Sequence, residues 1–449
     1  MKLSIHGGLN EIGGNKILLE DSGSRVWFDF GTSFSRLSMF YDEFMNPRSH
    51  NGMTDFFEMG LLPDIKGLYR HDFLGKCSRS DCKSEFDAVF LSHAHIDHSG
   101  MIPFLNKDIP VFCSPASKLI MRVMQETGSG IGQEFEIMKE HFTGLHYTKV
   151  PHFIRQVHVV NKPIKIKDLE VEPVCVDHSI PGALGFIIKG SKTVVYTGDL
   201  RMHGHNSKLT HDFVKKAVKA KPDILITEGT RVGGDHRKMG LSEEECLAHI
   251  TKYMSDTKGL VVANFPPRDL DRIKTFYSAA VACGRKLVID PKMAVLLNLL
   301  QEDKSLDAPS PKDKHIQVYI KKKKDGNYSE KDYDKWEREF LDYKNKVTYK
   351  ELEQKKSVIY LNAWAFGELI DIKPVNNSSY IYSLCEPFND EMELDHERHL
   401  NWIKHFKLDY KQAHASGHAS EEDINKMIKE INAKEVVMVH SQALNKIGN

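Results

Sequence analysis

An apolar run at residues 88–91 leads directly into a cluster of metal-ligand-type residues, His93, His95, Asp97 and His98. We interpret the run as a buried strand whose end delivers the cluster to the carboxyl edge of a sheet. There His93 and His95, two positions apart, face the same side, and Asp97 and His98 begin the next turn. Imidazole nitrogen and carboxylate oxygen suit a divalent ion such as zinc. The pattern therefore predicts a metal site on a sheet-containing fold.

The chemistry expected of such a site is hydrolysis. One ion lowers the pKa of bound water to about 7, and a partner ion about 3.5 to 4 Å away clamps both oxygens of a displacement at phosphorus. Five or six ligands of this kind across one chain suffice for a pair of ions. A solvated histidine-rich loop is the alternative, and we reject it because the cluster follows a strand of buried character.

Composition limits the partners and the compartment. Lys plus Arg and Asp plus Glu number 62 each, so no basic field covers the whole chain, and nucleic-acid binding would need a local cleft. Seven cysteines, an odd number, do not form a disulfide framework and suit a reducing compartment. No apolar leader and no run of about 18 apolar residues is present, so we expect a cytoplasmic protein with no membrane contact.

Up to about residue 230 the chain alternates strand-like runs with helical patterns. Runs rich in Val, Ile and Phe predict strands at 3–5, 16–19, 26–30, 88–91, 171–176, 194–196 and 224–227. Helices are predicted at 117–125 and 212–219. Together they predict a mixed α/β domain. Glycine pairs at 7–8 and 13–14 flank the first turn and predict a hairpin, because no Gly-Lys-Ser/Thr ending of a phosphate loop follows.

Longer helices replace this pattern after residue 230. They are predicted at 242–253, 270–283, 293–301, 331–341 and 394–406, with strand-like runs at 259–263, 286–289 and 358–361. This alternation predicts βα units and a parallel sheet. Ligand-type residues return at His414, His418 and His440. We therefore assign residues 1–230 and 411–449 to one domain, into which residues 231–410 are inserted.

A basic run at Lys321 to Lys324 lies within this insertion, near Tyr319, Tyr328 and Trp336. Basic residues interleaved with aromatic ones can contact a phosphate backbone. A run of this kind is more often a solvated loop, and Gly326 supports that interpretation, which we favour.

Two further ligand-type residues stand where predicted strands end. His178 follows the strand at 171–176, and Asp199 follows Gly198 beyond the strand at 194–196. A lone carboxylate there can bridge two cations, but Gly-Asp is also common in turns. A lone histidine at a strand end is more often structural. The first cluster favours a ligand role for both.

Taken together, these residues and Asp29, in the sequence Phe28-Asp29-Phe30-Gly31, resemble the metallo-β-lactamase superfamily. Three later segments resemble motifs A, B and C of the β-CASP nucleases: Thr227-Glu228-Gly229-Thr230, Ser416-Gly417-His418-Ala419 and Val439-His440-Ser441. Residues 7–15 resemble the opening of ribonuclease J. Because nine residues follow His440, we expect a form similar to the short archaeal members.

The resemblance implies a metallo-β-lactamase αββα sandwich with an inserted β-CASP α/β domain, and a centre of two zinc ions, with manganese as the other metal considered. By position in the motifs, one ion would be held by His93, His95 and His178, and the second by Asp97, His98 and His440. Asp199 would bridge the two ions. Asp29 would orient the ligands from behind, a role that metal sites generally need.

The resemblance also implies the catalytic and substrate-binding groups. Asp97 would position the attacking water, and Glu228 with His418 would assist proton delivery to the departing oxygen. His414, Ser416, Gly417 and His418 would bind substrate, since small residues let the backbone approach a phosphate. The alternatives are a capping or ion-pair role for Glu228, a structural loop histidine at 418, and a strand-to-helix turn at 414–420 in which Ser420 caps a helix.

We therefore expect a metal-dependent ribonuclease that trims single-stranded RNA from the 5′ end, with endonuclease activity and a homodimer as open points. A histidine in motif C is typical of the β-CASP relatives that act on RNA. The alternatives are a DNA-processing β-CASP nuclease and a non-catalytic RNA-binding subunit of a processing complex. We rank the last one low, because pseudo-enzymes lose ligands and this chain keeps all seven.

Overall fold

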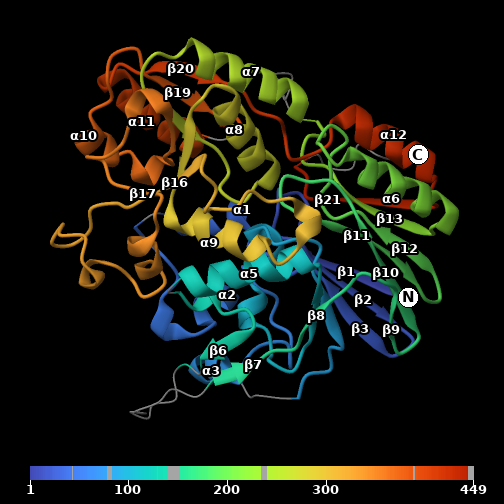
Figure 1. Cartoon of the computed structure of the whole chain (residues 1–449). Coiled ribbons are helices and arrows are strands. Elements are labelled where there is room, and N and C mark those ends of the chain that lie inside the picture. The colour runs from blue at the N-terminus through green and yellow to red at the C-terminus, as the bar shows by residue number, and fades with distance from the viewer. Residues whose placement is uncertain are drawn as a thin grey trace. The chain divides into compact units, whose positions relative to one another are not determined.

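The computed structural model describes residues 1–42, 44–77, 83–128, 130–139, 141, 152–233, 240–387 and 390–442. The chain divides into two units (Figure 1). The first contains Met1–Met202, Asn206–His236 and His418–Asn449, and the second contains His203–His205 and Arg237–Gly417.

Two six-stranded sheets form the first unit. One has the order β1-β2-β3-β4-β5-β8, with strands Lys2–Gly7, Lys16–Asp21, Ser24–Phe28, Ala88–Phe90, Val111–Cys113 and Val157–Val159. The other has the order β21-β13-β12-β11-β10-β9, with strands Glu435–Val439, Ile224–Glu228, Thr193–Tyr196, Leu184–Lys189, Leu169–Cys175 and Ile164–Ile166. Strands β6 (Ile137–Lys139) and β7 (His152–Ile154) form a separate pair.

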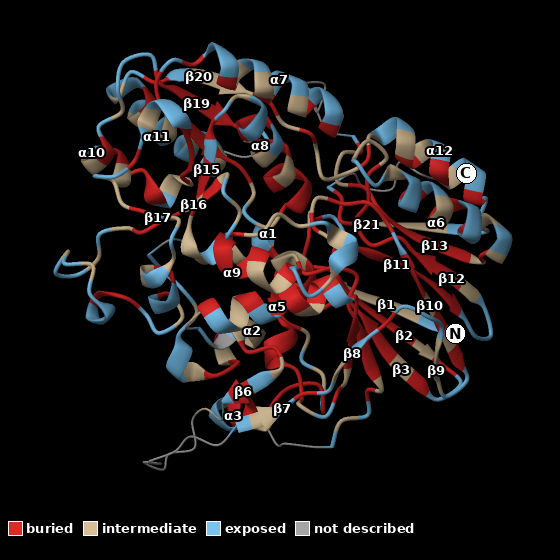
Figure 2. Cartoon of the chain, viewed as in Figure 1, coloured by how far each residue is buried: buried red, intermediate tan, exposed pale blue. Residues whose placement is uncertain are grey.

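Alternating side chains explain how the two sheets pack. In β13, Ile224 and Ile226 join a buried cluster with Ile17 and Phe28 of the other sheet, so the sheets lie face to face. Leu225, between them, points to the opposite face, as the two-residue period of a strand requires. Inner strands such as β4, β5 and β13 are buried along their whole length, whereas the edge strands β1, β8, β9 and β21 are partly exposed (Figure 2).

Helices cover the outside of this sandwich. Helices α6 (Ser207–Ala220) and α12 (Glu421–Ile431) pack Phe213 and Met427 onto the outer face of the second sheet. Helix α5 (Pro115–Thr127) contacts β8 of the first sheet. The short helices of the unit are α1 (Phe34–Leu37), α2 (Thr54–Glu58), α3 (His71–Leu74) and α4 (Ile96–Ser99). The layers are thus helix, sheet, sheet, helix, as expected for an αββα sandwich.

The second unit is built on a seven-stranded sheet in which every pairing is parallel, as the βα alternation predicted. Its order is β17-β16-β15-β18-β14-β19-β20, with strands Lys346–Val347, Ile316–Tyr319, Lys286–Ile289, Ser357–Tyr360, Val261–Asn264, Ser379–Tyr382 and Asp409–Gln412. Its helices are α7 (Glu243–Asp256), α8 (Leu270–Ala282), α9 (Pro291–Leu300), α10 (Glu368–Ile372) and α11 (Asp390–His405).

The borders between the units lie a few residues after those assigned from sequence, at 236/237 and 417/418 instead of 230/231 and 410/411. Val232 packs in the outer cluster of the first unit, and β20 pairs with β19 in the sheet of the second unit. Residues 203–205, which sequence assigned to the first domain, belong to the second unit.

One predicted helix is wrong. Residues 331–341 form no α-helix, and the region contains two short 3-10 turns, Glu330–Asp332 and Arg338–Asp342. Asp332 accepts hydrogen bonds from Ser329, and Glu337 accepts one from the backbone N–H of Asp334. Such side-chain to backbone bonds compete with the helical ladder.

Candidate metal centre

Strand β4 brings the first four ligand-type residues to the edge of its sheet. The strand is buried along its whole length and ends at Phe90, and α4 begins at Ile96. His95 is the N-terminal cap of α4 with extended backbone, so His93 and His95 precede the helix while Asp97 and His98 lie in its single turn. The strand-then-turn geometry expected from the sequence is the one observed.

Three histidines meet at one point. His95 Nδ1 lies 3.1 Å from His93 Nε2 and 3.1 Å from His178 Nε2. His178 reaches this point from the loop after β10. Burial, and then the neighbouring His98 and His178, hold the pKa of His93 well below its ordinary value. A neutral imidazole is the form that binds a metal ion.

A second group contains Asp97, His98, Asp199 and His440, whose ligand atoms lie within 4.8 Å of one another. His440 Nε2 is 3.0 Å from Asp97 Oδ2, and His98 Nε2 is 3.1 Å from Asp199 Oδ2. Burial alone would raise the pKa of the Asp97 carboxyl, but His98 and the hydrogen-bonded His440 hold it below its ordinary value.

Asp199 lies between the two groups. Its Oδ2 is within 4 Å of a ring nitrogen from each of five histidines, at 3.8, 3.1, 3.9, 3.9 and 3.4 Å for His93, His98, His178, His418 and His440. Its Oδ1 is buried with no hydrogen-bond partner among the described residues. A buried carboxylate oxygen without a hydrogen-bond donor lowers the stability of the folded state unless another group, such as a cation, binds it.

These observations test whether a metal fits. The donor set is imidazole and carboxylate only, and the Asp199 carboxylate of the second group lies within 4 Å of His93 and His178 of the first. The buried Asp199 Oδ1 also has no hydrogen-bond partner among the described residues. All three suit divalent cations. The site therefore has the ligand set of a divalent-metal centre.

Asp29 lies directly behind the ligands and is completely buried. Its Oδ1 accepts the backbone N–H of Ser92 at 2.7 Å. Its Oδ2 accepts from Ser92 Oγ at 2.7 Å and from Tyr196 Oη at 2.6 Å, and lies 2.8 Å from His98 Nδ1. The Asp29 carboxylate thus holds His98 by the ring nitrogen that faces away from Asp199.

Sequence reasoning did not single out the residues that hold Asp29. Besides Ser92 and Tyr196, they include Asn15, whose Nδ2 donates to Tyr196 Oη at 3.0 Å. A tyrosine hydroxyl and an asparagine inside an apolar sandwich were the available signal, because buried polar groups need partners.

The opening glycines lie against the same turn. The backbone N–H groups of Gly14 and Asn15 donate to the Asp97 carbonyl at 3.0 and 3.2 Å. A Cβ placed on Gly13 would lie 2.6 Å from Asp97 Cβ, and one on Gly31 would overlap the Asp97 carbonyl. These two positions must be glycine because the chain passes too close to Asp97 for a side chain.

Glu228 and His418 form a pair beside Asp199. His418 Nδ1 lies 2.9 Å from Glu228 Oε2, and Thr230 Oγ1 donates to the same oxygen at 2.7 Å. Glu228 Oε1 accepts the backbone N–H of Leu200 at 2.8 Å. Burial lowers the pKa of His418, but Glu228 outweighs it and raises that pKa to about 9. The ion-pair interpretation of Glu228 is therefore observed, and it leaves His418 beside the ligands.

The predicted substrate residues His414, Ser416 and Gly417 belong to the second unit. His414 Nδ1 lies 3.1 Å from the Ser383 carbonyl and 3.2 Å from Arg272 Nη1. Ser420 caps α12 by accepting the backbone N–H of Asp423 at 3.1 Å, as the strand-to-helix interpretation predicted.

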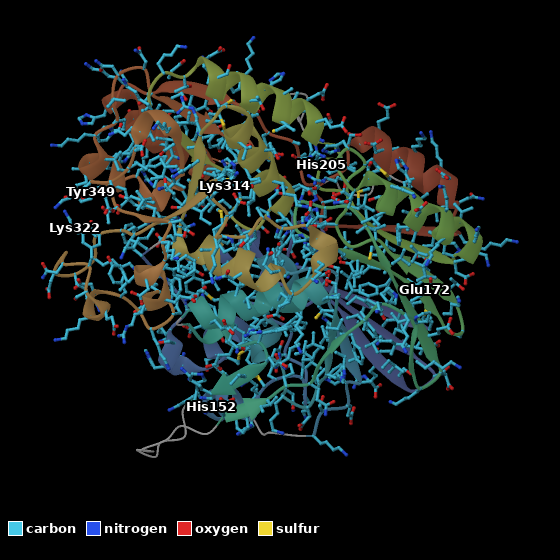
Figure 3. All side chains as sticks on the ribbon, in the orientation of Figure 1. His152, Glu172, His205, Lys314, Lys322 and Tyr349 are labelled. Carbon is cyan, nitrogen blue, oxygen red and sulfur yellow. The ribbon has the colours of Figure 1, made fainter. Side chains whose placement is uncertain are left out.

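The basic run at 321–324 lies in a loop, and its lysines at 322, 323 and 324 have acidic or backbone partners. Lys323 Nζ is 2.7 Å from both oxygens of Glu337, and Lys322 Nζ is 3.2 Å from Asp371. Lys322 also lies 5.8 Å from the centre of the Tyr349 ring; both residues are labelled in Figure 3. The structure favours the solvated-loop interpretation.

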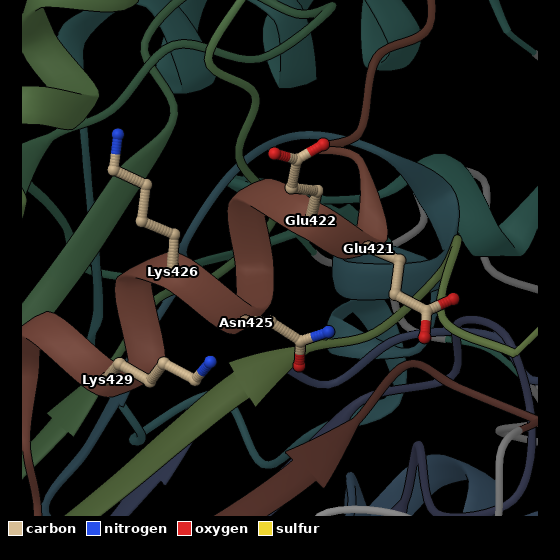
Figure 4. A pocket seen from close by; sticks show the side chains of 5 residues that line it. All are labelled: Glu421, Glu422, Asn425, Lys426 and Lys429. Carbon is tan, nitrogen blue, oxygen red and sulfur yellow. The ribbon is translucent and has the colours of Figure 1, made fainter.

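A surface hollow along α12 lies apart from the candidate metal ligands. It is lined by Glu421, Glu422, Asn425, Lys426 and Lys429, and it contains none of the predicted site residues (Figure 4).

Among the residues that the structure describes, no helix is long and apolar enough to cross a membrane.

Comparison with known proteins agrees with this geometry. The family described as "Beta-lactamase superfamily domain" matches residues 72–260, which contain the first cluster, His178, Asp199 and Glu228. Ribonuclease J of Helicobacter pylori is 23% identical over 454 residues, 98% of this chain and 56% of the relative. Ribonuclease J of Mycolicibacterium smegmatis is 26% identical over 296 residues, covering 64% of this chain and 44% of the relative.

A probable RNase of Methanocaldococcus jannaschii, MJ4, is 33% identical over 176 residues, 37% of this chain and 40% of that protein. The chain spans about half the length of the curated relatives it matches. A crystal structure of a protein of unknown function from Enterococcus faecalis has a TM-score of 0.72 at 22% identity, and covers 99% of this chain and 96% of that one. The whole described fold therefore has a solved counterpart.

Proposed function

We propose that this chain, a ribonuclease J-like β-CASP member of the metallo-β-lactamase superfamily, is a two-zinc ribonuclease that trims single-stranded RNA from its 5′ end. The observation that carries the proposal is the position of Asp199 Oδ2, within 4 Å of a ring nitrogen from each of five histidines. The names of the relatives supply the substrate class, RNA.

In this proposal His93, His95 and His178 hold one ion, and Asp97, His98 and His440 hold the other, with Asp199 shared. When bound, two such cations supply Lewis-acid activation of water and of the phosphoryl oxygens. Zinc is favoured by the histidine-rich donor set, and manganese is the second metal to test.

In this proposal the chain's own side chains orient the attacking water, donate a proton to the departing oxygen and hold the ligands in place. Asp97, exposed more than the other carboxylates of the site, orients the attacking water. Glu228 fixes the His418 ring through Nδ1, and in its imidazolium form His418 donates from Nε2 to the departing oxygen. Asp29 keeps His98 in place through Nδ1. His414, Ser416, Gly417 and His418 contact a neighbouring phosphate.

The proposal is tested with 5′-monophosphorylated RNA and the matching DNA, each labelled on its 5′ phosphate and incubated with the protein and zinc or manganese. We expect loss of RNA with release of mononucleotides and intact DNA. Fragments of intermediate length would show endonuclease cleavage instead of 5′ trimming. Loss of DNA with intact RNA would favour a DNA-processing nuclease, and tight RNA binding without cleavage would favour a non-catalytic subunit.

Variants connect the activity to the site. His440→Ala should abolish turnover, because it removes a ligand, while His211→Ala on the exposed side of α6 should not. Equal activity in the two variants would contradict the assignment.

A further inference from the structure

The second unit contains a buried ion pair that the proposed chemistry does not use. Arg272, in the first turn of α8, lies with Nη2 3.0 Å from Oε1 of Glu243, the first residue of α7. The two side chains are 0% and 1% exposed. A fully buried pair of this kind is a weak source of stability, so its role is sought in what the two side chains hold in place.

The Arg272 guanidinium also holds the segment that carries the predicted substrate residues. Nη2 donates to the Ala415 carbonyl at 3.2 Å, and Nη1 donates to the Ser383 carbonyl at 3.2 Å and to Ser383 Oγ. Ser383 Oγ in turn donates to the Ala413 carbonyl at 2.5 Å. The carbonyls of Ala413 and Ala415, on either side of His414, are thereby held by Ser383 and by Arg272.

A second stretch of chain is tied to the same segment. Residues 203–205 belong to this unit, and His203 Nε2 donates to the Ser416 carbonyl at 2.9 Å. The backbone N–H of Glu243 donates to the His203 carbonyl at 3.3 Å. Glu243 therefore contacts one stretch through its backbone and the other through Arg272.

We propose that Arg272 and Glu243 are positioning residues for substrate binding: their buried pair fixes the backbone at 413–416 so that His414, Ser416 and Gly417 present a preformed surface to a phosphate of single-stranded RNA. The inference rests on the proposed function, which assigns that phosphate to this segment. A planar fork that donates in several directions is what arginine supplies and lysine does not.

The main variant replaces both charges, Arg272→Met with Glu243→Met, because removal of one partner alone would leave a buried unpaired charge. Arg272→Lys is the second variant, since it keeps the cation but loses the fork. Arg285→Met is the matched control. Arg285 is another buried arginine of the same unit, and it donates to the carbonyls of Gly259, Thr257 and Ser357, away from residues 413–416.

Three measurements separate positioning from a general loss of structure. Fluorescence anisotropy with a 5′-phosphorylated RNA oligonucleotide and EDTA-treated protein reports binding without any metal or turnover. Steady-state kinetics give KM and kcat separately, and thermal unfolding with zinc titration reports the fold and the metal centre. We expect the double variant to weaken RNA binding and raise KM about 10- to 100-fold. Its kcat should change far less and its zinc affinity should be unchanged.

The RNA affinity and KM of Arg272→Lys should lie between those of the wild-type protein and the double variant. Arg285→Met should bind RNA as the wild-type protein does. Wild-type RNA binding in both Arg272 variants, or an equal loss in Arg285→Met, would overturn the inference. If the double variant fails to fold, Arg272→Lys alone decides by its KM. Failure of the proposed function is distinguishable, because the wild-type protein itself would then cleave no RNA.

Discussion

Tyr196 Oη donates a 2.6 Å hydrogen bond to Asp29 Oδ2, the oxygen that also faces His98 Nδ1. The tyrosine belongs to β12 of one sheet, and Asp29 follows β3 of the other. This bond joins the two sheets directly behind the ligands. The order of the metal centre therefore depends on how the sheets pack.

Tyr196→Phe should weaken zinc binding about 10- to 100-fold, as loss of a group behind a ligand typically does. It removes a donor to Asp29 and leaves Asn15 Nδ2 without its acceptor, which should also cost about 1–3 kcal/mol of folding stability. Competition with a chromophoric chelator measures the affinity. Tyr380→Phe is the control, because Tyr380 is equally buried and its hydroxyl also accepts from an asparagine, Asn264, at 3.0 Å. Equal zinc affinities in the two variants would argue against a role behind the ligands.

Asp199→Asn should abolish stabilisation by zinc. The wild-type protein should gain about 2.7 kcal/mol of unfolding free energy when free zinc is 100-fold above the dissociation constant. The variant loses the shared carboxylate and should show little zinc-dependent shift in Tm. Thermal unfolding with and without zinc measures this, with Asp212→Asn, an exposed carboxylate of α6, as control. A full zinc-dependent shift in Asp199→Asn would show that Asp199 is not shared between ions.

Gly13→Ala and Gly23→Ala form a matched pair. Both glycines have left-handed backbone, with φ of 77° and 79°, so alanine adds about 1–2 kcal/mol of strain at either position. Only at Gly13 does the new Cβ meet Asp97, at 2.6 Å, because Gly23 has no atom within 4 Å. Gly13→Ala should therefore lose zinc affinity as well as stability, whereas Gly23→Ala should lose stability alone. Isothermal titration with zinc and urea unfolding separate the two effects.

Lys16 should make stability depend on pH in the alkaline range. Burial lowers its pKa to about 8, from an ordinary value near 10.5. Between these values the unfolded chain keeps the proton that the folded chain has lost, so stability rises with pH across this window. The contribution is about 3 kcal/mol over the 2.5-unit shift. Lys16→Met should remove this rise. The free energy of unfolding, measured with urea, should therefore differ less between pH 7.5 and pH 10.5 in the variant than in the wild-type protein. An equal difference in both proteins would mean that Lys16 keeps an ordinary pKa.

Local pattern was sufficient for the first ligand cluster. His93 to His98 lie next to one another in the sequence, and a single strand and turn place them, so their spacing alone predicted the arrangement seen after β4. Glu228, His418 and His440 come from distant segments and were identified by motif resemblance. The structure brings all three to Asp199 or to its neighbours.

Other features could not be predicted from local pattern. Asn15 and Asp29, which adjoin strands of the first sheet, bond to Tyr196 of the second only because the two sheets meet, and no spacing along the chain encodes that. The α-helix predicted at 331–341 does not form. The side chains of Asp332 and Glu337 accept hydrogen bonds from nearby backbone N–H groups, and these bonds compete with the hydrogen bonds of a helix. The assignment of 203–205 to the second unit depends in part on the contact of His203 with Ser416, more than 200 residues later.

Among the strands that the structure describes, β21 pairs with β13 alone, in parallel register from Glu435 to Val439, and His440 follows it directly. During synthesis the three-histidine group and the Asp97 turn can therefore form well before their last partner exists. A growing chain remains unable to complete the second ligand group until this edge strand adds to the sheet. The order of the segments thus delays assembly of the complete ligand set until the chain has been made through His440.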